Sequence, residues 1–260
     1  MRKLMFLMAL SIAGAAKMKA DPACVANTAA FYEATYTSQA NGCSIGGLNF
    51  YDFNAGAYGV LGDSGPGTSP FTAASIDITP VNGPSGIGFL ITPVTTFQAG
   101  GTGVRDLELP FEVSCANGTA CLTSIFMSIT GSATASGIPS GTSGEDVLTE
   151  SYCLGGVSPP PTAPCSGGAV VQNTLTITPS SPGVLSPPPV AFSGVSELSI
   201  DKDIEALGNN GSATITSVDD LFLAPLTTPP ATAPEPSVAL MLAAGLMGFA
   251  LLYRRKRRPV

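Results

Sequence analysis

The stretch "TSIFMSIT", Thr123–Thr130, decides the fold class because its apolar and polar positions alternate. In an extended chain, Ile125, Met127 and Ile129 face one side and the residues between them face the other. A period of two with β-branched residues is typical of a strand with one buried face. We therefore predict a strand that forms one wall of a hydrophobic core.

The same period recurs in four other segments that are separated by residues typical of turns. They are "SIDIT" (Ser75–Thr79), "NTLTIT" (Asn173–Thr178), "ELSIDKDI" (Glu197–Ile204) and "SATITSV" (Ser212–Val218). Several short strands with turns between them are typical of a sandwich or a barrel. We therefore predict an all-β fold, a secreted β-sandwich of jelly-roll type, over residues 21–226.

One segment, Asn27–Cys43, departs from this alternation. It reads "NTAAFYEATYTSQANGC", with Asn27 as a candidate N-cap and Asn41-Gly42 as a candidate stop. We expect one short helix here, anchored to the core by Phe31.

Residues 1–20 have the pattern of a secretory signal peptide. Arg2 and Lys3 form a positive start, Leu4–Ala16 is apolar, and cleavage is expected after Ala16 or Ala20. The alternative is an ordinary buried N-terminal helix. We expect an exported chain whose folded body begins near Asp21.

The charges separate sharply along the chain. Between Asp21 and Ala233 there are only two basic residues, Arg105 and Lys202, against seventeen carboxylates, which gives a formal net charge near −15. So acidic a body should repel nucleic acid and attract cations. Because the chain has no histidine and no tryptophan, it lacks the commonest general base and the strongest platform for stacking sugars.

An even number of cysteines in an exported chain indicates disulfides. Pairing of nearest neighbours is expected, with the "NG" turn at Asn117-Gly118 forming a hairpin that brings the middle pair together. The alternative is a metal site, but no CxxC spacing and no histidine support it, so no cofactor is expected. The expected pairs are Cys24 with Cys43, Cys115 with Cys121, and Cys153 with Cys165.

The last part of the chain reads as a spacer, an apolar segment and a basic end. Residues 227–233 are proline-rich and should be stiff. Ser237–Tyr253 carries no charge and as a single transmembrane helix would span about 26 Å, enough for a bilayer core. The basic run that follows should stay on the cytoplasmic side. This pattern indicates a C-terminal membrane anchor, either permanent or removable.

The order of these elements resembles the PEP-CTERM protein-sorting domain of Gram-negative bacteria, over residues 234–260. In that family an integral-membrane cysteine protease, the exosortase, processes the protein near the Pro-Glu-Pro motif. The resemblance implies that the precursor is held in the membrane and that the mature form is at the cell surface or extracellular. It assigns recognition to Pro234, Glu235 and Pro236, and the membrane stop to Arg254, Arg255, Lys256, Arg257 and Arg258.

The body also resembles a recurrent lineage of PEP-CTERM ectodomains with an early cysteine pair and a late "KDI" element. No activity is established for that lineage, so the resemblance implies a shared fold and, from the sorting context, association with exopolysaccharide or biofilm matrix. It rests on "GCSIGGLNFYDF" (Gly42–Phe53), "IDITPV" (Ile76–Val81), "TESYC" (Thr149–Cys153) and "LSIDKDI" (Leu198–Ile204).

Two sets of charged residues are candidate sites. Lys202 falls in register with Ile200 and Ile204, so it should point inward and pair with a carboxylate; we interpret it as a structural ion pair rather than a catalytic lysine. Acidic groups could supply calcium ligands, but none matches a calcium-loop motif and we interpret them as solvated strand faces. They are Asp106, Glu108 and Glu112, and Glu145, Asp146 and Glu150.

No catalytic constellation is evident, so the leading expectation is a non-enzymatic surface or extracellular-matrix protein. The alternative is a β-sandwich that binds carbohydrate, with or without calcium. A secreted hydrolase, which would need two carboxylates across a cleft, is the third hypothesis.

Overall fold

The computed structural model describes residues 21–53, 72–135, 143–154 and 170–223. The chain divides into two compact units, Met1–Ala224 and Pro225–Val260. All described residues belong to the first unit.

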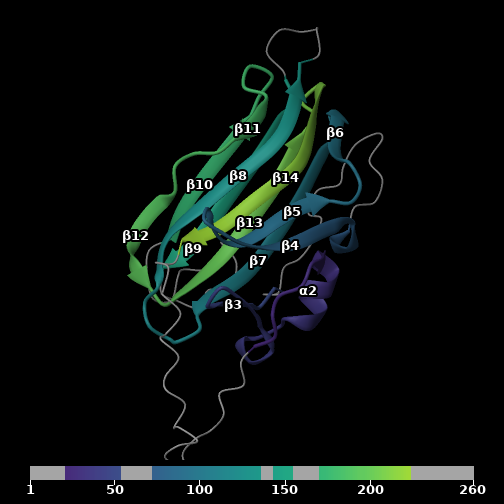
Figure 1. Ribbon diagram of the computed structural model, residues 1–260. Coiled ribbons are helices and arrows are strands. Elements are labelled where there is room, and N and C mark those ends of the chain that lie inside the picture. The colour runs from purple at the N-terminus through teal and green to yellow at the C-terminus, as the bar shows by residue number, and fades with distance from the viewer. Residues whose placement is uncertain (1–20, 54–71, 136–142, 155–169, 224–260) are drawn as a thin grey trace, which may run out of the picture. The chain divides into compact units, whose positions relative to one another are not determined.

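Two antiparallel sheets pack face to face (Figure 1). The inner-facing side chains of both sheets form one hydrophobic core. The first, called the six-stranded sheet, has the order β10 (Val170–Ile177), β9 (Glu145–Leu154), β13 (Glu197–Leu207), β7 (Val104–Cys115), β3 (Leu48–Tyr51) and β2 (Cys43–Ile45).

The second, called the eight-stranded sheet, is built around its two longest strands, β14 (Gly211–Leu223) and β8 (Leu122–Thr134). Each is long enough to pair with two shorter strands along one edge: β14 pairs with β5 and β6, and β8 with β11 and β12. The remaining bounds are β1 (Asn27–Thr28), β4 (Ile76–Gly83), β5 (Gly86–Pro93), β6 (Phe97–Gly101), β11 (Gly183–Leu185) and β12 (Val190–Val195).

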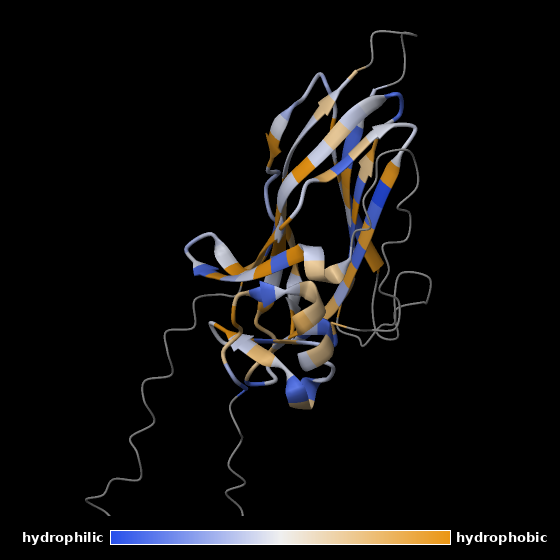
Figure 2. Cartoon of the chain, turned by 90° about the vertical axis from the view of Figure 1, so that its right-hand side faces the viewer, coloured by the Kyte–Doolittle hydropathy of each residue, from blue (hydrophilic) through white to orange (hydrophobic). Residues whose placement is uncertain are grey.

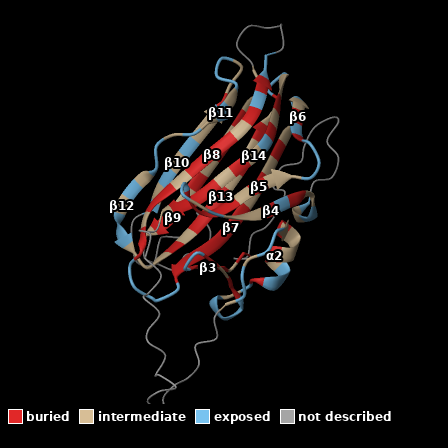
Figure 3. Cartoon of the chain, in the orientation of Figure 1, coloured by how far each residue is buried: buried red, intermediate tan, exposed pale blue. Residues whose placement is uncertain are grey.

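The predicted all-β sandwich is confirmed, and the five alternating segments lie within β4, β8, β10, β13 and β14 except for Ser75 and Thr178 at their ends. In β8, Ile125, Met127 and Ile129 are all buried against the other sheet. Figure 2 shows the alternation of apolar and polar residues along the strands. Figure 3 shows burial concentrated on β7, β8, β13 and β14, whereas the edge strands β10, β11 and β12 are mostly intermediate or exposed.

One short α-helix, α2 (Ala29–Thr35), lies beside β4 (Figure 1), and two 3₁₀ turns occur at Gln39–Asn41 and Ala73–Ser75. The helix was expected, but two details were wrong. The N-cap is Thr28, whose side chain accepts from the Phe31 N–H, and not Asn27. The main anchor is Tyr32, which is fully buried, whereas Phe31 is only partly buried.

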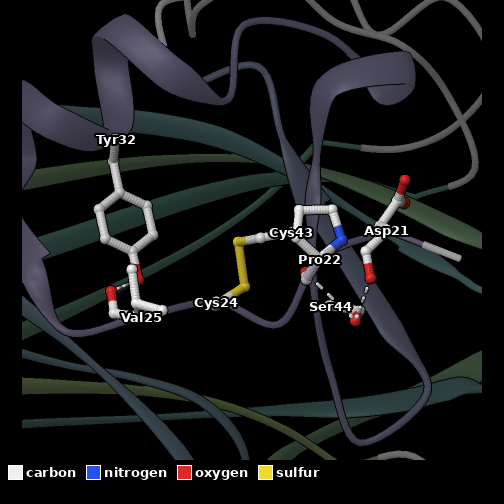
Figure 4. The surroundings of a disulfide bond; sticks show 7 residues. All are labelled: Asp21, Pro22, Cys24, Val25, Tyr32, Cys43 and Ser44. Atoms are coloured by element: carbon white, nitrogen blue, oxygen red, sulfur yellow. Dashed lines mark hydrogen bonds between the residues drawn. A yellow bond between two sulfur atoms is a disulfide. The ribbon is translucent and has the colours of Figure 1, made fainter.

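The predicted disulfide between Cys24 and Cys43 is present (Figure 4). It ties the segment before α2 to β2, where Ser44 also donates a hydrogen bond to the carbonyl of Asp21 at 3.2 Å. The hydroxyl of Tyr32 donates to the carbonyl of Val25 at 2.7 Å, which fixes the helix to the same segment.

The predicted disulfide between Cys115 and Cys121 is also present, but the predicted hairpin around it is wrong. Both edges of β7 are already paired, with β13 and with β3, so the chain turns at Asn117-Gly118 and enters β8 of the other sheet. The bridge therefore joins the two sheets at a corner. Cys153 is disulfide-bonded as well; its expected partner, Cys165, lies outside the described residues.

The predicted signal peptide, the spacer 227–233 and the segment 234–260 lie outside the described residues too. Within the part of the chain that is described, no helix is long and apolar enough to cross a membrane.

Candidate functional site

A β-bulge in β14 determines which of its side chains enter the core. Ile215 pairs with Gly131 and Ser217 with Thr130, so Thr216 is an extra residue between two successive pairs. After the bulge the inward set changes to Val218, Asp220 and Phe222, and all three are buried. The bulge therefore places a carboxylate in the core.

Asp220 meets Lys202 and Glu150 between the two sheets. The Nζ atom of Lys202 lies 3.2 Å from Oε2 of Glu150 and 3.5 Å from Oδ2 of Asp220, and all three side chains are fully buried. Glu150 is the cross-strand neighbour of Lys202 in the six-stranded sheet, whereas Asp220 comes from the opposite sheet. The predicted inward lysine with a carboxylate partner is confirmed, with two partners instead of one.

The electrostatics of this triad favour one retained proton. Burial, followed by the neighbouring charge of Glu150, raises the pKa of Asp220 to about 8, and burial also raises the pKa of Glu150. Burial disfavours the ammonium of Lys202, but the two carboxylates outweigh it and raise its pKa overall. At neutral pH Lys202 is therefore an ammonium, and Asp220 retains its proton.

The charged groups of the triad are close together but do not form well-aligned hydrogen bonds. The ion-pair distances are short, yet neither the lysine nitrogen nor any of the four carboxylate oxygens has a hydrogen bond of standard geometry. A buried ion pair normally needs such bonds to offset the loss of hydration. Keeping the triad ionised in the core therefore carries a desolvation free energy that its contacts offset only in part.

A cavity of about 160 Å³ lies near the triad, at the open edge of the sandwich between β10 and the strands β8 and β12. Asn173 and Met127, which line it, are the cross-strand neighbours of Glu150 and Asp220 respectively. The eight-stranded sheet contributes Ile125, Met127 and Val190, β10 contributes Asn173, Thr174 and Leu175, and the segment before β12 contributes Pro187 and Pro188.

The side chains that line the cavity are uncharged. Asn173 Nδ2 donates to the hydroxyl of Tyr152 at 3.4 Å, and the ring of Tyr152 lies 6.0 Å from that of Phe192. Its described lining includes an amide, a hydroxyl and apolar groups, with no carboxylate, thiol or amine. Such a lining has the polarity of a site for a small neutral ligand.

Two of the expected acidic groups, Asp146 and Glu150, belong to the core instead of a solvated strand face. Both are fully buried because their strand, β9, turns its even-numbered residues inward. Asp146 lies against Gly131 of the opposite sheet, where an added Cβ would come within 2.4 Å of its Oδ2. Burial raises the pKa of Asp146 to about 7, although the Ser132 backbone lowers it slightly, and neither oxygen has a hydrogen bond of standard geometry.

The outer face of the six-stranded sheet carries the other acidic groups. In the register of the neighbouring strands β13 and β7, Asp203 lies opposite Glu108, and Glu205 lies opposite Asp106. Burial and the charge of Asp106 raise the pKa of Asp203 to about 7. Asp201, on the same face, is 7% exposed, and burial raises its pKa to about 6.

Glu112 lies on this outer face as well and is 3% exposed, so it too departs from the expected solvated face. Burial, then the charge of Asp52, raise its pKa to about 7. Among the described residues, no group of three His, Cys, Asp or Glu side chains is arranged to hold a metal ion. The structure therefore does not bring the calcium candidates together.

Sequence reasoning missed Asp220 and Asn173. Val218 and Phe222 flank Asp220 at a spacing of two, which is the pattern of an inward-facing residue. The predicted strand, Ser212–Val218, ends before Asp220 and therefore does not include it. Nothing in the sequence pointed to Asn173. The sorting motif Pro234–Pro236 and the basic run 254–258 lie outside the described residues.

Comparison with known proteins finds distantly similar solved structures but does not assign the chain to a family. No family model and no curated protein matches the sequence. The chain is similar to the structure of TmCBM61 in complex with beta-1,4-galactotriose, at 10% identity and a TM-score of 0.27, covering 57% of this chain and 83% of that one.

A second similar structure is the enzymatically active domain of tailspike protein 4 from bacteriophage CBA120, at 10% identity and a TM-score of 0.22. The match covers 68% of this chain but only 18% of the tailspike chain. At such TM-scores neither likeness carries an argument about ligand or activity.

Proposed function

We propose that this chain is an exported protein of the cell surface or extracellular matrix, with no catalytic activity of its own. The observation that carries the proposal is the presence of two disulfides, Cys24–Cys43 and Cys115–Cys121. Such bonds persist in oxidising compartments outside the cytoplasm. The cavity without a reactive group agrees with it. A jelly-roll-like connectivity and a C-terminal transmembrane helix in the precursor are parts of the same proposal.

Delivery is assigned to an exosortase-type system that acts at Pro234–Pro236, and the mature protein associates with exopolysaccharide. The test is expression in a Gram-negative host that carries an exosortase, with one antibody against the ectodomain and one against residues 254–260. We expect the released protein to react only with the ectodomain antibody. Replacing Pro234, Glu235 and Pro236 by alanine should leave a full-length, membrane-retained form.

Replacement of Pro229 and Pro230 in the spacer by alanine is the matched control and should leave processing unchanged. Detection of the C-terminal tail on released wild-type protein would refute cleavage. A cytoplasmic, reduced ectodomain would refute export altogether.

A second candidate function is carbohydrate binding at the open-edge cavity, supported by its combination of amide and hydroxyl groups with apolar walls. Calorimetric titration with oligosaccharides of the producer's own polysaccharide tests it. Asn173→Ala should weaken binding at least tenfold, whereas Asn82→Ala, at an exposed position on β4, should not. Repeating the titration with a chelator would separate calcium-dependent from calcium-independent binding, and hydrolysis of the oligosaccharides would favour the hydrolase hypothesis.

A further inference from the structure

The buried triad has the composition and placement needed for a chemical reaction within the protein. A primary amine lies 3.5 Å from one carboxyl oxygen and 3.2 Å from another, and all three side chains are shielded from solvent. We propose that Lys202 and Asp220 condense to an intramolecular isopeptide bond that joins the two sheets, with Glu150 as the catalytic proton carrier. This goes beyond the proposed function and does not depend on it.

The condensation balances within the three side chains. Glu150 takes a proton from the Lys202 ammonium, and the free Nζ lone pair attacks Cγ of the protonated Asp220 carboxyl. A C–N bond forms, Glu150 returns its proton to one hydroxyl oxygen of the tetrahedral intermediate, and the C–O bond breaks to release water. The last proton, from the new amide group, goes to Glu150. The products are a neutral amide, a neutral Glu150 acid and one water molecule, and no oxidant or cofactor is consumed.

Asp220 is the electrophile and Glu150 the proton carrier because their surroundings differ. The reacting carboxyl must be protonated, and burial followed by the charge of Glu150 raises the pKa of Asp220 to about 8. Burial also raises the pKa of Glu150, but there the neighbouring ammonium of Lys202 is the next largest cause and opposes the rise. Glu150 lies closer to Nζ and is therefore the better placed base. Glu150 is also a strand neighbour of Lys202 in one sheet, so only the bond to Asp220 crosses the core.

The environment favours the reaction in three ways. Fixing the amine beside the carboxyl replaces a bimolecular encounter, which is worth several orders of magnitude in rate. The surrounding core, with Ile200 and Ile204 beside Lys202 and Phe222 beside Asp220, is buried and limits hydrolysis of the product. The reaction also converts an imperfectly compensated buried ion triad into neutral groups, which removes the desolvation cost of the charges.

The bond would act as a mechanical clamp. β13 and β14 are consecutive strands but belong to different sheets, and β14 is the last described strand before the C-terminal segment. A load applied through that segment reaches β14 first. With the bond in place the load passes covalently from β14 into the six-stranded sheet, whereas without it β14 is held against the inner face of that sheet by packing.

The test is mass spectrometry of the purified exported protein after reduction and alkylation. We expect the wild type to be lighter than its processed sequence by one water molecule. Glu150→Gln and Lys202→Arg should both show the full mass, because the first lacks the proton carrier and the second lacks the nucleophile. Asp77→Ala, at an exposed position on β4, is the control for the loss of one carboxylate and should keep the mass loss.

Peptide mapping of the wild type locates the bond even if a variant fails to fold. Cleavage after glutamate should yield Leu198–Glu205 joined to the peptide that starts at Ala206, and fragmentation should reveal two N-termini. Trypsin should not cut after Lys202, since its side chain no longer carries a charge. Unmodified Lys202 in the wild type would overturn the proposal, and a branch at Glu150 would overturn the choice of electrophile.

Discussion

Asp146 should make the folded protein less stable as the pH rises, and Asp146→Asn should reduce that dependence. The side chain is fully buried and neither oxygen has a hydrogen bond of standard geometry. Burial raises its pKa from an ordinary value of 3.8 to about 7. Because the folded value exceeds the unfolded one, the contribution to stability is fully present below about pH 4 and is lost as the pH rises through 7.

The magnitude follows from the size of the change in pKa. A rise from 3.8 to about 7 corresponds to roughly 4 kcal/mol at full ionisation, since one pKa unit is about 1.4 kcal/mol. At pH 5 the unfolded chain already holds most of this carboxyl ionised, so about 2–3 kcal/mol of the loss falls between pH 5 and pH 8. Asparagine has nearly the same shape and does not titrate.

The assay is urea unfolding of wild type and Asp146→Asn at pH 5 and pH 8, which yields the free energy of unfolding of each. We expect the variant to be the more stable protein at pH 8, with a smaller decline between the two pH values. Asp77→Asn, at an exposed position on β4, controls for the loss of one formal charge. Equal declines in wild type and Asp146→Asn would refute the assignment of a raised pKa to this carboxyl.

Three further changes test the packing. Gly131→Ala should destabilise the fold by about 1–3 kcal/mol in urea unfolding, because the new Cβ would lie 2.4 Å from Asp146 Oδ2; unchanged stability would mean that the sheets adjust freely there. Replacing Cys115 and Cys121 together by alanine should lower the free energy of unfolding by about 2 kcal/mol, and no change would show that the corner is held by packing alone. Tyr32→Phe should cost about 1 kcal/mol through the lost hydrogen bond of its hydroxyl, with an unaltered melting temperature as the contrary result.

The period-two pattern was sufficient to predict five of the strands. It also predicted the inward direction of Lys202, because β13 keeps its alternation through Ile200 and Ile204. It was not sufficient for β14. An unbroken alternation from Ile215 would turn Asp220 toward solvent, and only the extra residue at Thr216 reverses the direction. A bulge depends on pairing with β8, so local sequence does not specify it uniquely.

The hairpin prediction at Cys115 failed for a related reason. The Asn117-Gly118 pair does form a turn, with the Gly118 N–H donating to the Cys115 carbonyl at 2.9 Å. Whether the next strand then pairs with β7 depends on whether an edge of β7 is free, and both edges are occupied by strands distant in sequence. Cysteine spacing was enough to predict the bridge, whereas the sheet to which each cysteine belongs is a tertiary property.

The positions of the carboxyl groups in the fold change the net charge that the acidic composition implies. Three of them, Asp146, Glu150 and Asp220, are fully buried, and the pKa of Asp220 is raised to about 8, so they are not all ionised at neutral pH. The body is therefore less negative than its formal charge. Condensation of Lys202 with Asp220 would leave Glu150 as a neutral acid and Asp146 as the core carboxyl that still titrates near neutral pH. In the cross-linked protein both acids would be neutral in the folded state and ionised in the unfolded chain, so both would lower stability as the pH rises. Asp146→Asn would remove only the share that comes from Asp146, whereas the loss of one water molecule reports the bond between Lys202 and Asp220 directly.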